Sequence, residues 1–232
     1  MKLFYIPNFD DKFYIFDKIE SKHISKVLRL KNGNLIYFTD GKGKLYKAKI
    51  IDDNHKKVKI SILEIEKVIK KTNFLHIAIA PTKNISRFEW FLEKATEIGI
   101  NEITPILCEH SERKNIKFER SEKIIISAMK QSLKLFLPKL NNMIKFEDFI
   151  LKKSNNLKFI SHCKNQKKIL LKNAKKNEKK FLILIGAEGD FSEKEIKMAE
   201  ENNFKSVSLG ESRLRTETAG IVACHTFNLL QD

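Results

Sequence analysis

The stretch LILIGAEGDFSEKEI (residues 182–196) decides how the C-terminal part of the chain is interpreted. An apolar run of strand length ends at Gly186, and a second glycine follows three residues later. Ser192 and Glu195 have the spacing of a capping box, which predicts that a helix begins at Ser192. The loop 186–190 therefore follows the carboxyl end of a strand, the position at which ligands bind in open α/β sheets.

Around this stretch, from about residue 73 onward, apolar segments alternate with amphipathic ones. We predict a helix at residues 84–98, with Gly99 as its C-terminal stop. The lysine-rich segment 164–180 is predicted to form a solvated helix face, with RNA contact as the alternative. The alternation predicts an α/β fold in which helices cover both faces of a largely parallel sheet. The predicted strands are residues 75–80, 103–108, 157–162, 181–186 and 206–210.

The first 70 residues have a different, β-rich pattern. Strand segments are predicted at 35–40, 45–52 and 57–66, the first two on either side of a glycine turn. Short strands joined by short connections predict a small β-barrel. We place the boundary near residues 68–73 and predict two domains, 1–70 and 71–232.

A second glycine loop favours a ligand at the sheet edge. Ser208-Leu209-Gly210 ends another predicted strand and leads into a final helix rich in small residues. Glu188 and Glu217 suit hydroxyl groups or a cationic ligand, and neither loop has a lysine placed to bind phosphate. These features favour S-adenosylmethionine, an adenosine with a positive sulfonium, over a nucleoside triphosphate. Tight turns that hold no ligand are the alternative.

The composition indicates a polyanionic partner. Lys and Arg number 45 against 29 Asp and Glu, a formal net charge of +16, which favours nucleic acid. AT-rich coding, which enriches lysine without selection for binding, is the alternative. Against that background the six arginines are informative, because a guanidinium supports planar bidentate contacts, and two of them are Arg213 and Arg215.

Other bulk features bear on compartment and site type. The three cysteines are odd in number, far apart and form no C-x-x-C pair, which predicts a reducing compartment without a disulfide framework or a zinc site. No apolar run approaches the roughly 20 residues that span a bilayer, and the N-terminus lacks the apolar core of a signal peptide. We therefore expect a cytoplasmic protein that neither associates with a membrane nor binds a metal ion.

The two loops together resemble the signature of the RsmE family, methyltransferases of 16S ribosomal RNA in the SPOUT class. The chain has GAEGDFSEKE at 186–195 and LGESRLRTETA at 209–219, where the family pattern is approximately G-P-E-G-G-F-S-x-x-E and L-G-x-R-I-L-R-T-E-T-A. Further matches run in order through the chain: His23 with Val27-Leu28-Arg29, then Lys83, Arg87, residues 94–99, Pro105, residues 111–113 and Gln131-Ser132.

The resemblance implies a PUA-like N-terminal β-barrel that binds RNA and a C-terminal SPOUT domain whose deep trefoil knot holds S-adenosylmethionine. It also implies a homodimer that methylates N3 of a uridine in the decoding region of 16S rRNA, in the small ribosomal subunit. Two alternatives stay open. One is a SPOUT methyltransferase acting on another rRNA site or on tRNA, and the other is a non-catalytic RNA-binding homologue.

The resemblance also yields candidate site residues. The candidate cofactor-binding residues are Leu184, Gly186, Glu188, Gly189, Leu209, Gly210, Leu214, Arg215, Thr216, Glu217 and Ala219. The candidate catalytic residues are Arg215, to stabilise the anion of the target base, and Glu217 as a base, with capping or cofactor orientation as the alternative for Glu217. The candidate RNA-binding residues are His23, Arg29, Lys83, Arg87, Arg113, Arg120 and Arg213. Arg213 is a second candidate for the anion, and His23 and Arg29 could instead have structural roles.

Three positions depart from the family pattern. Ala187 stands where the family usually has proline, and Asp190 where it usually has glycine. Ser212-Arg213 replaces the usual Arg-Ile, which displaces an arginine by one position. We expect the first two to affect the first glycine loop, and the third leaves the role of Arg213 open.

Overall fold

A computed structural model of the chain describes residues 2–69, 72–174 and 178–231. The chain divides into two compact units, Met1–Lys70 with Met129–Leu137, and Lys71–Ala128 with Pro138–Asp232. Residues 70 and 71, on which the predicted boundary falls, lie outside the described residues. The sequence did not indicate that residues 129–137 group with the N-terminal segment.

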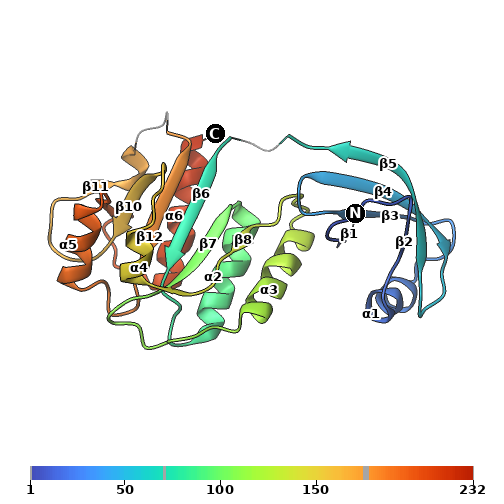
Figure 1. The fold of residues 1–232 in the computed structure, drawn as a ribbon, viewed down its shortest axis with the longest axis horizontal. Coiled ribbons are helices and arrows are strands. Elements are labelled where there is room, and N and C mark those ends of the chain that lie inside the picture. The colour runs from blue at the N-terminus through green and yellow to red at the C-terminus, as the bar shows by residue number, and fades with distance from the viewer. Residues whose placement is uncertain (1, 70–71, 175–177, 232) are drawn as a thin grey trace. The chain divides into compact units, whose positions relative to one another are not determined.

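The first unit is built on a curved five-stranded sheet (Figure 1). The strand order is β1 (Leu3–Tyr5), β3 (Leu35–Thr39), β4 (Lys44–Asp52), β5 (Lys59–Lys67) and β2 (Phe13–Ile15). Only β1 runs parallel to its neighbour, β3. Register shifts within the β4–β5 pair are irregularities of the kind that bend and twist strands. One short helix, α1 (Lys18–Lys22), continues into a π-helical turn, η1 (His23–Val27).

Aromatic side chains fill the core of this unit. Phe38 stacks on Tyr46 with ring centroids 4.4 Å apart, and Phe9 meets both rings edge-on. The segment 129–137 packs against the β3–β4 turn, where Gly43 donates its N–H to the Leu135 carbonyl at 2.9 Å. This long-range contact explains why the segment belongs to the first unit.

The second unit contains a parallel sheet with eight strands among the described residues. The order is β11 (Ile169–Leu170), β13 (Lys205–Ser208), β10 (Leu157–Ser161), β12 (Lys180–Ile185), β6 (Phe74–Ile79), β7 (Glu102–Leu107) and β8 (Lys139–Leu140), with β9 (Ile144–Lys145) also paired to β7. The five predicted strands are confirmed as β6, β7, β10, β12 and β13, with bounds that shift by one or two residues. Every described residue of β12 after Lys180 is buried, as expected for a strand covered on both faces.

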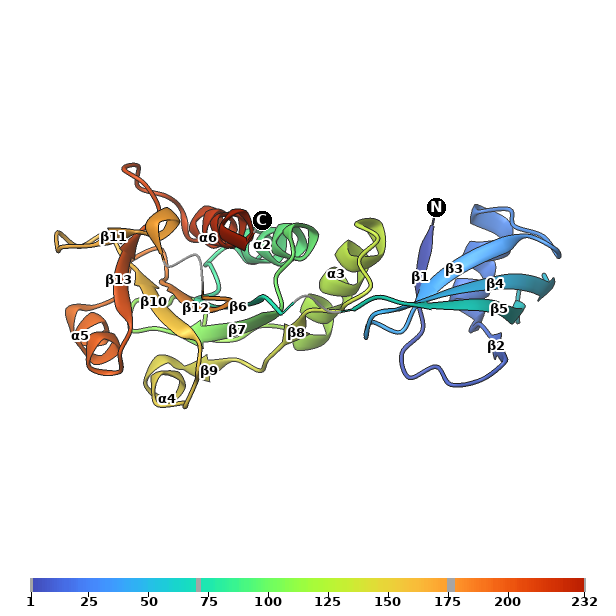
Figure 2. The ribbon, with the colours of Figure 1, turned by 90° about the horizontal axis from the view of Figure 1, so that it is seen from above.

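Helices lie on both faces of this sheet, as Figure 2 shows. One face carries α2 (Ile85–Ile98) and α6 (Thr216–Gln231), and the other carries α4 (Phe146–Ile150) and α5 (Glu193–Glu201). A further helix, α3 (Phe118–Gln131), ends within the segment 129–137. None of the helices in the described ranges combines the length and apolar character needed to cross a bilayer.

The small residues of α6 bring it close to its neighbours. A methyl group added at Gly220 would lie 2.6 Å from the Phe91 ring of α2 and 3.0 Å from Ile79 of β6. Both neighbours are buried, so glycine is the residue that this helix crossing accommodates. This packing holds the start of α6 against the sheet.

The prediction for the lysine-rich segment 164–180 was wrong. In place of a solvated helix, this segment forms a loop, the short strand β11 and one 3₁₀ turn, η2 (Leu171–Asn173); residues 175–177 lie outside the described residues. Lysine-rich composition is compatible with helix propensity, but here pairing of β11 with β13 decides the local structure.

Candidate functional site

A cavity of about 560 Å³ lies at the carboxyl edge of the parallel sheet. It is formed by the segments that end the adjacent strands β13, β10 and β12, together with the start of α6. This is the edge predicted from the first glycine loop, since parallel strands present their carboxyl ends on the same side. The volume lies within the range typical of pockets for small molecules and cofactors.

The first glycine loop is built as the capping box predicted. Ser192 accepts the Glu195 N–H at 3.2 Å, and the Glu195 carboxylate accepts the Ser192 N–H at 2.9 Å. Gly186 lines the cavity, where a side chain would meet the Phe191 ring at 3.1 Å. The cap therefore starts α5 and leaves the preceding loop free to form the cavity wall.

Most of the candidate cofactor residues lie together in this cavity. Those that line it are Gly186, Glu188, Leu209, Gly210, Leu214, Arg215, Thr216 and Ala219. Leu184 does not, because this residue of β12 is fully buried in the hydrophobic core. Gly189 does not either, since its α-carbon faces His110, whose Cβ would lie 2.9 Å from an added methyl group.

Glu217 also stays outside the cavity lining. Its side chain is buried in the first turn of α6, and its Oε1 lies 3.8 Å from Nε of Arg87, near the start of α2. The Oε2 atom is buried without a hydrogen-bond partner among the described residues. The Arg87–Glu217 pair thus links the start of α2 to the start of α6. The Glu217 carboxylate is not among the groups that line the cavity.

The sequence missed a third wall, residues 161–168. Ser161, His162, Cys163 and Lys168 line the cavity after β10, the strand that lies between β12 and β13. The available signal was the predicted strand at 157–162, whose carboxyl end must share an edge with the two glycine loops. The cavity is also lined by Arg213, a candidate for RNA binding, and by residues outside the candidate sets: Ile185, Ala187, Asp190, Ser208, Glu211 and Ser212.

Hydrogen bonds determine which ring nitrogen of His162 carries the hydrogen. Ser206 donates its hydroxyl hydrogen to Glu200 at 3.0 Å, so its oxygen must accept a bond from Nε2–H of His162, also at 3.0 Å. Burial, with help from nearby Lys168, lowers the pKa of His162 and keeps the ring neutral at pH 7. Its Nδ1 is then an acceptor, buried and without a partner among the described residues.

The RNA-binding candidates of this unit gather at the same sheet edge but differ in their contacts. Arg113 donates to the backbone carbonyls of Thr82 and Lys83, at 2.9 and 2.6 Å, and Arg120 donates to Glu89. The bond from Arg120 also holds the pKa of Glu89 below its usual range. Both arginines therefore have structural partners, which the sequence could not indicate.

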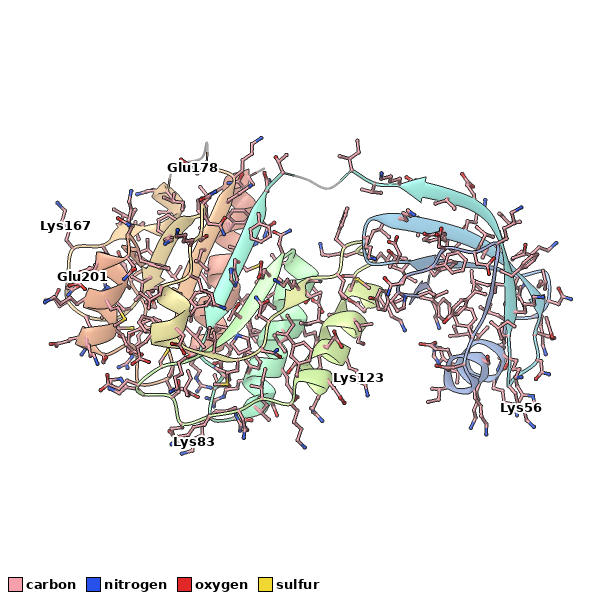
Figure 3. All side chains as sticks on the ribbon, in the orientation of Figure 1. Lys56, Lys83, Lys123, Lys167, Glu178 and Glu201 are labelled. Atoms are coloured by element: carbon pink, nitrogen blue, oxygen red, sulfur yellow. The ribbon has the colours of Figure 1, made fainter. Side chains whose placement is uncertain are left out.

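The other cations are more available. Arg213 and Arg215 are exposed and line the cavity. Lys83 projects outward from the edge to which the strand arrows point, as Figure 3 shows, while its ammonium pairs with Glu112 at 2.8 Å. In the first unit, His23 and Arg29 are exposed, and Arg29 has the left-handed φ of 55°.

No three His, Cys, Asp or Glu side chains gather into a group that could hold a metal ion within the described ranges. Of the three cysteines, Cys108 and Cys224 are buried and Cys163 is exposed. Burial raises the pKa of Cys108 well above its ordinary value.

Comparison with known proteins identifies both units. A family model described as an RNA methyltransferase domain matches residues 70–228, and one described as an RNA methyltransferase PUA domain matches residues 11–63. Ribosomal RNA small subunit methyltransferase E of Mesomycoplasma hyopneumoniae is 31% identical over 227 residues, which cover 95% of this chain and 96% of that protein. The fold class is therefore a PUA-like domain followed by an α/β methyltransferase domain.

Solved structures agree with this assignment over the whole chain. The crystal structure of a probable rRNA-methyltransferase from Porphyromonas gingivalis is 40% identical and aligns with a TM-score of 0.93, covering 100% of this chain and 98% of that one. Ribosomal RNA small subunit methyltransferase E from Neisseria gonorrhoeae, solved bound to S-adenosyl methionine, is 26% identical with a TM-score of 0.89 and coverages of 99% and 98%. The chain belongs to the ribosomal RNA small subunit methyltransferase E family.

Proposed function

We propose that this protein transfers the methyl group of S-adenosylmethionine to N3 of a uridine in the decoding region of 16S rRNA. The observation that carries the proposal is the cavity at the ends of β10, β12 and β13, which brings the two signature loops together. Family membership and the cofactor-bound relative from Neisseria gonorrhoeae support the same activity.

The cavity suits S-adenosylmethionine in size and in chemistry. Glu188, Asp190 and Glu211 place carboxylates on a lining that also carries Lys168, Arg213 and Arg215, so a ligand with both positive and negative groups finds partners there, and Gly186 and Gly210 have no side chain. His162 also lines the cavity, and its Nδ1 is buried without a hydrogen-bond partner among the described residues. When bound, the cofactor supplies an electrophilic methyl group on a positive sulfur.

The protein must also make the uridine nitrogen nucleophilic. N3 of uridine carries a proton, so methylation requires its removal and stabilisation of the resulting anion on the base. Arg215 lines the cavity and is exposed toward solvent, so its guanidinium can contact the base oxygens that carry this charge. Arg213, two residues earlier, is a second cation on the same wall.

We propose that Glu217 has a structural role and is not the group that removes the proton from uridine N3. Because it is buried beside Arg87 and does not line the cavity, it anchors the start of α6 and orients the residues before it. An acidic residue in the first turn also interacts favourably with the helix dipole.

RNA binding is assigned to the exposed cations of both units, with the PUA-like unit as an RNA-binding domain. Phosphate contacts release counterions, so the logarithm of the binding constant for a 16S rRNA fragment should fall linearly with the logarithm of salt concentration. The proposed contacts are the exposed Lys83, Arg213, His23 and Arg29, together with Arg87, which is half-buried and also pairs with Glu217. We further propose that the loops after β12 and β13 form a trefoil knot, and that the enzyme acts as a cytoplasmic homodimer.

Two measurements test the proposed function. Titration calorimetry with S-adenosylmethionine should give saturable binding, and the absence of heat and of thermal protection at millimolar cofactor would contradict it. Mass-spectrometric mapping of 16S rRNA from a deletion strain should then show loss of a 3-methyluridine. Survival of that nucleotide, with loss of a methyl group elsewhere in rRNA or tRNA, would favour another SPOUT specificity.

A further inference from the structure

Asp190 occupies a backbone position that favours glycine. Its φ is 65°, in the left-handed region that a side chain with a Cβ rarely adopts. It is the last residue of a turn that is closed by the bond from its N–H to the Ala187 carbonyl at 2.9 Å. A carboxylate at this position therefore needs compensation from contacts that glycine could not make.

Those contacts join two walls of the cavity. One carboxylate oxygen of Asp190 accepts the N–H of Cys163 at 2.7 Å, and the other accepts the N–H of Phe191 at 2.8 Å. The first bond links the loop after β12 to the loop after β10, 27 residues apart. Charge-assisted bonds to backbone N–H groups are short and strong, so this link fixes the position of the 161–168 wall.

Other bonds show that the wall is held from both ends. Lys168 donates to the carbonyls of His162 and Lys164, each at 2.8 Å, which closes the loop on itself. His110 donates its Nδ1–H to the carbonyls of Gly189 and Asp190, each at 3.1 Å, and this fixes the main chain that carries Asp190. The Asp190 carboxylate is the described side chain that ties this wall to the first glycine loop.

We propose that Asp190 is a positioning residue for the cofactor, which acts by holding the 161–168 wall, and His162 in particular, against the bound molecule. The inference rests on the proposed function of the cavity. Asp190 touches the cavity lining itself, but its effect passes through the Cys163 N–H and the neighbouring imidazole.

The test compares two glycine substitutions. Asp190→Gly removes both carboxylate bonds while relieving the left-handed backbone, and Asn203→Gly relieves a similar φ of 68° outside the cavity lining. Calorimetry should show that Asp190→Gly raises the Kd for S-adenosylmethionine roughly tenfold, as expected for one charge-assisted bond, while Asn203→Gly leaves it unchanged. Asp190→Asn, which keeps one acceptor oxygen, should fall between them.

Cys163 provides a readout of the wall itself. It is the exposed cysteine of the three, so N-ethylmaleimide modification of the folded protein, followed by mass spectrometry, reports on this position. We expect cofactor to slow modification in the wild type, and Asp190→Gly to modify faster without cofactor and to be less protected at saturating cofactor. Thermal unfolding of both variants controls for global stability.

The outcomes separate this inference from the proposed function. If the wild type fails to bind S-adenosylmethionine, both the proposed function and this inference are refuted. If the wild type binds and Asp190→Gly binds within twofold of Asn203→Gly, the positioning role is refuted while the function stands. Weaker binding with unchanged Cys163 modification would also refute it, because the effect would not pass through the wall.

Discussion

Arg215 illustrates how much depends on one side chain at the residue scale. It is exposed at the cavity wall, and among the described residues its side chain has no structural partner of the kind that holds Arg113 and Arg120. The motif pointed to Arg213 and Arg215, but it could not distinguish arginines that bind the protein's own backbone from those that face a ligand. That distinction depends on contacts between residues that are far apart in the chain.

We predict that Arg215→Ala lowers the single-turnover rate about 10²- to 10³-fold, the cost of removing one group that stabilises a developing anion. The Kd for cofactor should change far less. Arg215→Lys should recover part of the rate, and Lys123→Ala, at an exposed position of α3, serves as a charge-matched control. An unchanged rate in Arg215→Ala would remove this residue from the mechanism.

His76 supports a pH prediction at the same scale. It lies on β6 with its Nε2 2.7 Å from Oγ1 of Thr104, and burial lowers its pKa to about 4. Since the pKa of His76 in the unfolded chain is about 6.5, the unfolded chain binds a proton between about pH 6.5 and pH 4, where His76 of the folded protein stays neutral. This contribution to stability is therefore complete above about pH 6.5 and is lost as pH falls toward 4.

We expect the wild type to lose about 2 kcal/mol more stability between pH 7 and pH 4.5 than His76→Gln, which cannot titrate. Urea denaturation at the two pH values measures the difference. Equal losses for both proteins would show that His76 does not stay neutral in the folded state.

The elements differ in how far local sequence determines them. The start of α5 follows from Ser192 and Glu195 alone, and the close crossing of α6 follows from its small residues. The segment 164–180 shows the opposite case, because pairing of β11 with β13 overrides its lysine-rich composition. A pattern predicts an element well when its partners lie within a few residues along the chain.

The α6 crossing can be tested with one methyl group. Gly220→Ala places its Cβ against the Phe91 ring and Ile79, both buried and unable to yield, so we expect a net loss of about 1 to 2 kcal/mol despite the better helix propensity of alanine. His225→Ala, at an exposed position of the same helix, should not destabilise the protein. Chemical denaturation compares them, and equal stability of Gly220→Ala would contradict the packing argument.

At the scale of the whole molecule, the proposed homodimer has a surface on the second unit. Trp90 of α2 and Leu229 of α6 are 43% and 61% exposed, on two helices that pack together. If the two side chains form one apolar patch, that patch is the kind of surface that marks an interface, so we use these positions to test the dimer.

We predict that the double substitution Trp90→Glu and Leu229→Glu converts a dimer to a monomer in sedimentation velocity. Phe13→Glu, which alters an exposed aromatic of the first unit, is the control and should leave the assembly unchanged. A wild type that sediments as a monomer at micromolar concentration would contradict the proposed homodimer.

The sequence by itself determined the two-part organisation, the parallel sheet, the helix start at Ser192 and the two glycine loops, because each depends on short-range patterns of apolar spacing, capping and turn residues. The tertiary structure alone decided that the 161–168 wall completes the cavity, that Glu217 is buried beside Arg87, and that Asp190 bonds to Cys163. These features depend on strand order and on contacts between residues separated by 27 to 130 positions. Such contacts form only when the chain closes its long loops, and no local pattern records which side chains then meet.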